Sequence, residues 1–176
     1  MKPLTPRILR KFLKRAGDHL VGEWVVVGGT VLPLLGIDHR TTTDIDVAML
    51  SPSAPNHTLA LMGIAEELGL PIESINQAAA YFLYKIDSFQ SHLIVLHRGK
   101  KSTFYRPDIH LFFQLKLSRF SESDLRDCIV YLEFTKRSKE PFDPENLLKL
   151  VKKEKKKTTH TEKANRLEVL IQNLKG

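Results

Sequence analysis

The sequence predicts an α+β fold, in which a small mixed sheet is flanked by helices and a helical part follows at the C-terminal end. Two observations predict it. Over residues 5–105, segments with helical spacing of apolar residues alternate with short apolar runs typical of strands. From Pro107 onward, every periodic segment has helical spacing. The length of 176 residues suits one domain, or one domain with a small extension.

Residues 5–105 are expected to build the sheet and the helices around it. Thr5 is a suitable N-cap before Pro6, and Gly17 is expected to end the first helix. Ser74 is expected to cap a later helix. In order, we expect a helix over 6–17, a strand over 23–27, a short helical stretch over 30–36, a strand over 44–50, helices over 58–68 and 75–86, and a hairpin of strands over 91–97 and 102–105. The helix over 58–68 is expected to bury Leu59, Met62, Ala65 and Leu68.

The C-terminal part is expected to consist of helices over 108–119, 122–135, 144–156 and 161–174. Ser121 and Asp124 form a capping-box pattern, and Asp143 before Pro144 is a second good start. The stretch "KEPFDP", residues 139–144, is the best boundary between a main body and a basic tail. We therefore expect a main domain over 1–135 and a basic helical extension over 136–176.

Charge and composition restrict the class of protein. The net charge of +7 favours a polyanionic partner, with nucleic acid first, although the run "KKEKKK" at 152–157 also suits a solvated helix end. No apolar run is long enough to span a membrane, and the basic N-terminus has no hydrophobic block typical of a secretory signal. The single Cys128 excludes an internal disulfide and is expected in the core. Cysteine and histidine pairs with zinc-ligand spacing are absent. We expect a cytoplasmic protein.

The most informative stretch is "VVVGGTVLPLLGIDHRTTTDIDVAML", residues 25–50. Side chains alternate along a strand, so Asp44 and Asp46 are expected on one face and Ile45 on the other. Two carboxylates about 4 Å apart repel by roughly 4 kcal/mol at an effective dielectric constant of about 20. A divalent cation removes that repulsion, and magnesium prefers such oxygen ligands. The alternative is an exposed strand end bonded to a loop.

The glycine pair that follows the first strand suggests the other half of a site. Gly28 and Gly29 allow a tight turn and bring backbone amides close to an anion. The helical stretch after them adds a positive dipole end, and Thr30 adds a hydroxyl. Many α/β turns use glycine for geometry alone, so the combination with the aspartates is the specific feature. Together they predict a site for a nucleotide and a metal ion.

These residues resemble the signature of the nucleotidyltransferase superfamily with the polymerase-β-like fold. That signature is a glycine-rich turn, a spacer and an aspartate–apolar–acidic strand. More closely, the stretch resembles minimal bacterial nucleotidyltransferases, which include toxins of type IV toxin–antitoxin systems and share an arginine–x–threonine–x–aspartate–x–aspartate run. Arg40, Thr42, Asp44 and Asp46 fill that run. The resemblance implies that Arg40 and Thr42 contact an NTP, and that Mg²⁺, or Mn²⁺ in its place, binds Asp44 and Asp46.

The resemblance continues at "FYRPDIHLFFQLKLSRFSESDLRDCIVYL", residues 104–132. It implies that Lys116 touches the phosphates and takes part in catalysis. A lysine in the apolar helix "LFFQLKL" is also expected to meet an anion or a carboxylate, the alternative being that its ammonium reaches solvent. Arg119 lies one turn further and is a second expected nucleotide contact. Asp127 is expected to pair with Arg119 or Lys116, and Asp124 to serve as a cap.

One feature of the superfamily is missing. Active members carry a third carboxylate on a neighbouring strand, and the expected strand "SHLIVLH" contains no acidic residue. Asp87 is the nearest acidic substitute, and His92 or His97 is a weaker candidate for the base.

The leading hypothesis is a magnesium-dependent nucleotidyltransferase that transfers a nucleoside monophosphate from an NTP to an acceptor. The resemblance implies that tRNA is one such acceptor and that a cognate antitoxin is a further partner, and a membrane partner is not expected. The first alternative is a nucleotidyltransferase-like module that binds nucleotide or RNA without catalysis. The second is a pure interaction protein whose tail helices dock a partner.

Overall fold

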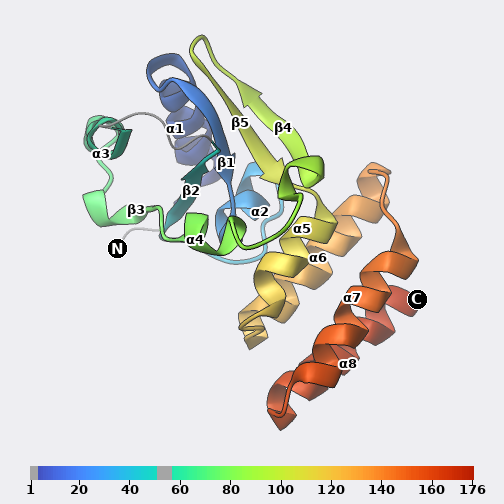
Figure 1. The fold of residues 1–176 in the computed structure, drawn as a ribbon. Helices are drawn as coiled ribbons and strands as arrows, with labels where there is room; N and C mark the ends of the chain where they lie inside the picture. Colours follow the sequence, from blue (N-terminus) through green and yellow to red (C-terminus); the bar gives the residue numbers. More distant parts are fainter. Residues whose placement is uncertain (1–3, 51–56) are drawn as a thin grey trace. The chain divides into compact units, whose positions relative to one another are not determined.

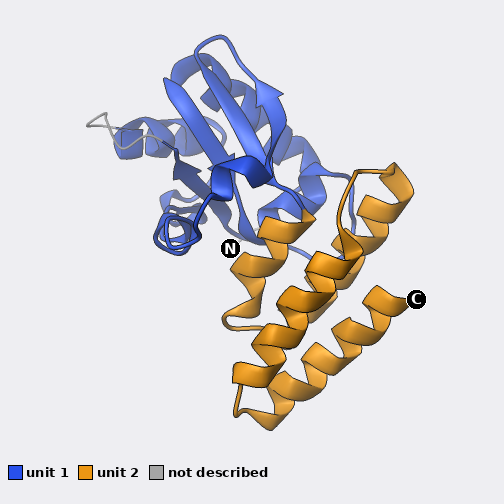
Figure 2. Ribbon diagram, turned by 45° about the vertical axis from the view of Figure 1, so that its right-hand side comes forward, with its two compact units in different colours: residues 1–108 blue, residues 109–176 orange. Residues whose placement is uncertain are grey.

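The computed structural model describes residues 4–50 and 57–176. The chain forms two compact units, residues 1–108 and residues 109–176 (Figure 2). The division expected at residues 135 and 136 falls inside a continuous helix, α6 (Glu122–Ser138), so the compact units separate earlier along the chain. The extent of the functional domain stays a prediction.

The first unit contains one mixed sheet, whose strand order in the described residues is β3–β2–β1–β5–β4 (Figure 1). The central strand β1 (Gly22–Val26) is antiparallel to β2 (Ile45–Met49) and parallel to β5 (Ser102–Pro107). β3 (Ile75–Asn76) pairs parallel with β2, and β4 (Leu93–Arg98) pairs antiparallel with β5. The expected hairpin and the two expected N-terminal strands are confirmed, and the architecture is α+β.

Helices and apolar side chains cover this sheet. The helices are α1 (Pro6–His19), α2 (Val31–Leu34), α3 (His57–Glu67) and α4 (Ala79–Leu83), with short 3₁₀ turns at Gly28–Thr30, Ile72–Ser74 and Phe89–His92. Trp24, Val25 and Val26 of β1 are fully buried, as are Phe104 of β5 and Phe12 of α1. Because β1 lies between two strands and under helices, its valine run has no exposed face.

The first helix starts as expected but ends later. The Thr5 hydroxyl accepts a hydrogen bond from the Ile8 amide at 3.3 Å, which confirms the N-cap. Gly17 does not end α1, which continues to His19. The glycine is used for packing instead, because a Cβ at Gly17 would overlap the backbone of Gly99 in the β4–β5 turn. The Lys101 amide donates to the Gly17 carbonyl at 2.9 Å across this contact.

Two other expectations for this unit are wrong. Residues 75 and 76 form β3 on the edge of β2, and the helix expected over 75–86 is reduced to α4. Ser74 does not cap it, because its hydroxyl donates to the Pro71 carbonyl at 2.6 Å. The buried stripe of α3 is Leu61, Ile64 and Ala65, whereas Leu59 is 68% exposed. Both faces of α3 carry apolar residues, so spacing alone did not identify the buried one.

The second unit consists of α5 (Ile109–Leu117), α6, α7 (Pro144–Lys157) and α8 (Thr161–Lys175), as expected. Ser121 and Asp124 form the expected capping box of α6, and the Asp143 carboxylate accepts from the Asn146 amide at 3.0 Å at the start of α7. Cys128 is buried in the core, as expected. Among the described residues, no helix is both long enough and apolar enough to cross a membrane.

Candidate functional site

The turn after β1 is shaped around one aspartate. Gly28 has a φ of +64°, a left-handed conformation that favours glycine. A Cβ at Gly28 would overlap the Oδ2 atom of Asp46, so the Asp46 carboxylate lies directly against this glycine. The Val27 amide donates to the Asp46 carbonyl at 2.9 Å, which fixes β2 beside the turn. The sequence-predicted proximity of the glycine turn and Asp46 is therefore present in the structure.

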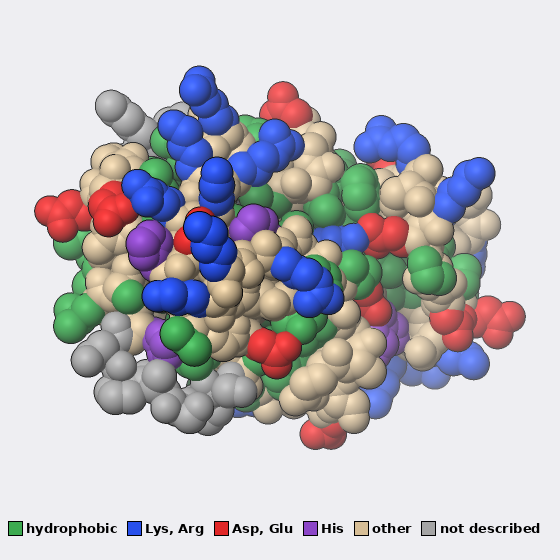
Figure 3. All heavy atoms as spheres, turned by 90° about the horizontal axis from the view of Figure 1, so that it is seen from above, with side chains coloured by type: hydrophobic (Ala, Val, Ile, Leu, Met, Phe, Trp, Pro, Cys, Tyr) green, Lys and Arg blue, Asp and Glu red, His purple; other side chains and the backbone are tan. Residues whose placement is uncertain are grey.

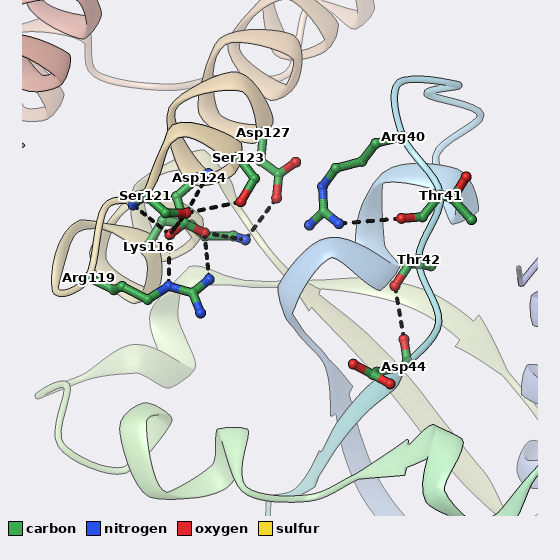
Figure 4. Close-up of polar contacts among 10 residues, drawn as sticks. All are labelled: Arg40, Thr41, Thr42, Asp44, Lys116, Arg119, Ser121, Ser123, Asp124 and Asp127. Atoms are coloured by element: carbon green, nitrogen blue, oxygen red, sulfur yellow. Dashed lines mark hydrogen bonds and ion pairs between the residues drawn. The ribbon is translucent and has the colours of Figure 1, made fainter. Parts of the chain in front are cut away.

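A buried threonine positions both aspartates. The Thr30 hydroxyl donates to the Asp44 carbonyl at 2.8 Å and accepts from the Asp46 amide at 3.2 Å. The Thr42 hydroxyl donates to the same Asp44 carbonyl at 3.2 Å (Figure 4). Because Thr30 is fully buried and Thr42 nearly so, this geometry favours positioning roles for both over the direct nucleotide contacts expected from the sequence.

The two aspartates keep the predicted alternation. Ile45 is buried, whereas Asp44 and Asp46 on either side of it are half-exposed. The Oδ1 atom of Asp44 accepts from the Thr43 hydroxyl at 3.3 Å. Both carboxylates are thus accessible to a solvated ion while their backbone is held rigidly.

Asn76 is the site residue that sequence reasoning missed. It stands opposite Asp46 in the parallel pairing of β2 with β3, and its Nδ2 atom donates to Asp46 Oδ1 at 2.6 Å. The expected strand "SHLIVLH" corresponds to β4, which β1 and β5 separate from β2, so a carboxylate on β4 would not lie beside Asp46. The only sequence signal for Asn76 is a two-residue strand, which has no measurable periodicity.

The predicted substitutes for a third acid lie elsewhere. Asp87 is exposed in the turn after α4, and His97 packs against Gly17. The His92 Nδ1 atom lies 2.7 Å from Asp108 Oδ2, so this histidine has a carboxylate partner of its own. Within residues 4–50 and 57–176, no group of three or more histidine, cysteine or acidic side chains is arranged to hold a metal ion.

The donor set nevertheless fits one kind of metal ion. Asp44 and Asp46 supply two carboxylates, and a magnesium ion is commonly bound by one or two carboxylates with water and substrate phosphates as its remaining ligands. An ion that needs a complete protein cage does not fit, because the described residues offer no third acid there.

A cation lies against the second glycine of the turn. A Cβ at Gly29 would overlap Nη2 of Arg40, so the absence of a side chain makes room for the guanidinium. Arg40 Nη1 also donates to the Thr41 carbonyl at 3.5 Å (Figure 4). The helix dipole expected here is small, because α2 has only four residues. An anion at this turn would therefore be held by Arg40 and backbone amides.

Exposed aromatic side chains lie on α4, five and six residues after Asn76. The Ala78 amide donates to Asn76 Oδ1 at 3.0 Å, and the Tyr84 hydroxyl donates to the Met49 carbonyl, so α4 lies alongside β2. On this short helix Tyr81 is 62% exposed and Phe82 is 52% exposed. Their ring centroids lie 5.4 Å apart in an edge-to-face arrangement. Tyr81 and Phe82 therefore form an exposed aromatic surface on the short helix that follows Asn76.

In the second unit, the predicted lysine is held between two acids. Lys116 Nζ donates to Asp124 Oδ1 at 2.9 Å and to Asp127 Oδ2 at 2.8 Å (Figure 4). Arg119 Nε donates to Asp124 Oδ2 at 3.1 Å. The expected pairing of Asp127 with Lys116 and the expected capping role of Asp124 are both confirmed.

Burial and charge act in opposite directions within this cluster. Burial alone would lower the pKa of Lys116, but the carboxylates of Asp127 and Asp124 raise it above its usual range. Burial would raise the pKa of Asp124, but hydrogen bonds from Arg119 and the charge of Lys116 hold it well below its usual range. Burial also raises the pKa of the neighbouring Cys128 thiol. Lys116 and Asp124 are therefore ionised at neutral pH, and Cys128 is protonated.

Comparison with known proteins gives a family. A family model described as "Nucleotidyltransferase of unknown function (DUF6036)" matches residues 8–173. The match includes the glycine turn, both aspartates and the Lys116 cluster. Searches of curated proteins and of solved structures gave no match.

Proposed function

Because the chain belongs to this family of nucleotidyltransferases of unknown function, we propose that it transfers a nucleoside monophosphate from an NTP to an acceptor hydroxyl and releases pyrophosphate, with magnesium as the cofactor. One observation supports this most. The Asp46 carboxylate lies against the left-handed Gly28, and Thr30 bonds to the backbone of both Asp44 and Asp46. A sheet that only needed a turn would not require a carboxylate to lie against a glycine.

The residues of the first unit have different roles in the proposed reaction. Asp44 and Asp46 hold the metal ion, which when bound neutralises phosphate charge and supports in-line displacement. Arg40 and the amides of Gly28 and Gly29 receive the phosphates. Asn76 orients the Asp46 carboxylate through its 2.6 Å hydrogen bond. With two carboxylates in place of three, activation of the acceptor hydroxyl falls to water or to the substrate.

The aromatic rings of α4 suit a nucleobase. Every base has an aromatic face, and stacking on an exposed ring contributes about 1–3 kcal/mol per base. In this proposal Phe82 or Tyr81 stacks on the base of the bound NTP or of the acceptor. The Lys85 ammonium, 3.8 Å from the centroid of the Tyr81 ring, adds positive charge beside the same surface.

The resemblance to toxin-type enzymes and the net positive charge favour RNA, including tRNA, as the acceptor. A cognate antitoxin, the predicted phosphate contacts of Lys116 and Arg119, and a cytoplasmic location stay predictions. Lys116 retains one N–H donor beyond the two that its acids accept, which is compatible with a phosphate contact.

The test is label transfer. The protein is incubated with each α-labelled NTP, magnesium and total cellular RNA, and the products are separated by size. We expect one or more NTPs to label RNA with wild-type protein and not with Asp46→Asn. Glu66→Gln, which changes an exposed carboxylate on α3, is the matched control and should transfer normally.

Two results would count against the proposal in different ways. Transfer that survives Asp46→Asn would exclude the metal role of Asp46. Absence of transfer to any acceptor, with retained NTP binding, would favour the alternative of a binding module.

A further inference from the structure

The outer face of α7 carries a dense set of lysines. They recur at intervals of one, three and four residues, so they share one side of the helix. All are exposed, and they line a shallow hollow of about 380 Å³. These residues, called the α7 lysine face below, are Lys149, Lys152, Lys153, Lys156 and Lys157.

The α7 lysine face differs from the other lysines of this unit in its partners. Lys155 pairs with Glu168 at 2.7 Å, and Lys163 of α8 pairs with Glu154 at 2.6 Å. Within residues 4–50 and 57–176, none of the five lysines of the face has an ion pair or a hydrogen bond from its side chain. The acidic side chains of α7 and α8 thus neutralise the seam between the helices and leave the outer face fully charged.

Such an arrangement carries a cost for the isolated helix. Like charges four residues apart on a helix surface are neighbours and destabilise the helix. The face contains three such pairs, Lys149 with Lys153, Lys152 with Lys156, and Lys153 with Lys157. The helix C-terminus offsets part of the repulsion for the last turn only. A bound anion would remove the remainder.

The surroundings of the face select among anionic partners. Membrane-surface helices insert an apolar face, but the apolar residues Leu147 and Val151 of α7 are buried in the unit. Interfaces between proteins are depleted in lysine and enriched in aromatic residues, and the hollow is lined by lysine alone. Lysine is a strong point-charge partner for phosphate, and a row of lysines suits a polyphosphate backbone.

We infer that the α7 lysine face binds the phosphate backbone of RNA without reading its sequence. From Lys149 to Lys157 the helix rises about 12 Å, enough to contact several phosphates. The inference rests on the proposed function and extends it. It assigns binding of an RNA acceptor to the α7 lysine face, whereas the proposed metal site is formed by Asp44 and Asp46.

The test compares salt dependence in two charge-matched variants. In one variant all five lysines of the face become glutamine. In the other, five exposed basic residues of α1 become glutamine: Arg7, Arg10, Lys11, Lys14 and Arg15. Lysine and arginine side chains also gather over α1 and the β4–β5 turn (Figure 3), so the second variant tests the competing basic surface with the same change in net charge.

Affinity for a 20-nucleotide single-stranded RNA and for a tRNA transcript is measured between 50 and 200 mM salt, without NTP. For single strands the slope of log K against log salt changes by about 0.7 per phosphate contact. We expect the α7 variant to lose up to about 3.5 from the slope and the α1 variant to lose less. Because like-charge repulsion is removed, the melting temperature of the α7 variant should be unchanged or higher.

Three outcomes would overturn the inference. These are an unchanged slope in the α7 variant, an equal loss in both variants, and lysine-dependent binding to phosphatidylserine vesicles without any change toward RNA. Asp46→Asn should bind RNA like the wild type. RNA binding by the wild-type protein without label transfer would therefore refute the proposed activity alone, and label transfer by the wild-type protein without lysine-dependent RNA binding would refute the RNA face alone.

Discussion

Substitution of Gly28 by alanine separates backbone strain from damage to the site. Gly28 has a φ of +64°, and a Cβ there would overlap the Asp46 carboxylate. Gly69 provides the matched control, since its φ is +65° and nothing lies within 4 Å of its Cβ position. Both alanine variants carry the same left-handed penalty, about 1–2 kcal/mol, which corresponds to a fall in Tm of about 2–8 °C.

Only Gly28→Ala must also move the Asp46 carboxylate. A displacement of about 1 Å at a reacting centre costs roughly 100-fold in rate. We therefore expect Gly28→Ala to lower kcat/KM for nucleotide transfer by about that factor and to raise the magnesium concentration for half-maximal activity. Gly69→Ala should leave both values unchanged at a temperature well below its Tm.

Thermal unfolding and a magnesium titration of transfer activity measure the two effects on the same samples. Equal values of kcat/KM and of the magnesium requirement in Gly28→Ala and Gly69→Ala would refute the reasoning, because the contact between Gly28 and Asp46 would then have no part in catalysis. If both variants lost activity to the same extent, backbone strain would be the cause of the loss.

The remaining predictions concern Asn76, the Lys116 cluster and α4. Asn76→Ala should weaken magnesium-dependent transfer by about 10–100-fold, as removal of a partner that orients a metal ligand usually does; Asn76→Asp, which places a third carboxylate beside Asp46, should lower the magnesium requirement, and unchanged titrations would contradict this role. Lys116→Met removes the ammonium that two buried carboxylates share and should cost about 3–5 kcal/mol in urea unfolding, whereas Arg119→Met, at a side chain 76% exposed, should cost less than about 1 kcal/mol. Because the pKa of Asp124 is lowered in the folded protein, its stabilisation is complete above the ordinary aspartate pKa of about 4 and declines as the pH falls below it; Asp124→Asn should therefore show a shallower loss of stability in acid, and parallel curves would argue against the ion pair. Phe82→Ala should raise KM for the NTP or the RNA by about 5–150-fold if stacking contributes its usual energy, while Leu59→Ala, at another exposed apolar side chain, should not.

Long periodic segments were predictable from the sequence. The helices of the second unit, the capping box of α6 and the N-cap of α1 follow from local patterns that extend over several turns. The position of Gly17 inside α1 and the two-residue strand β3 could not be predicted from local patterns, because both depend on contacts with residues far along the chain. Local propensity carries no information about such partners.

The site was predictable to a similar degree. The motif identified Gly28 and Asp46 as neighbours, and their contact is present. It did not reveal that Thr30 is buried between the aspartate backbones, or that Asn76 meets Asp46. Hydrogen-bond partners across a sheet depend on strand order, and the order β3–β2–β1–β5–β4 does not follow the chain.

That strand order has a consequence for synthesis on the ribosome. β1 is made early, yet its parallel neighbour β5 is made about 80 residues later, as the bond between Tyr105 and Glu23 indicates. Until then, one edge of an apolar central strand has no partner, and α1 lacks the hairpin turn that packs against Gly17. The nascent first unit is therefore most exposed to misassociation during that interval, when a chaperone would protect it best.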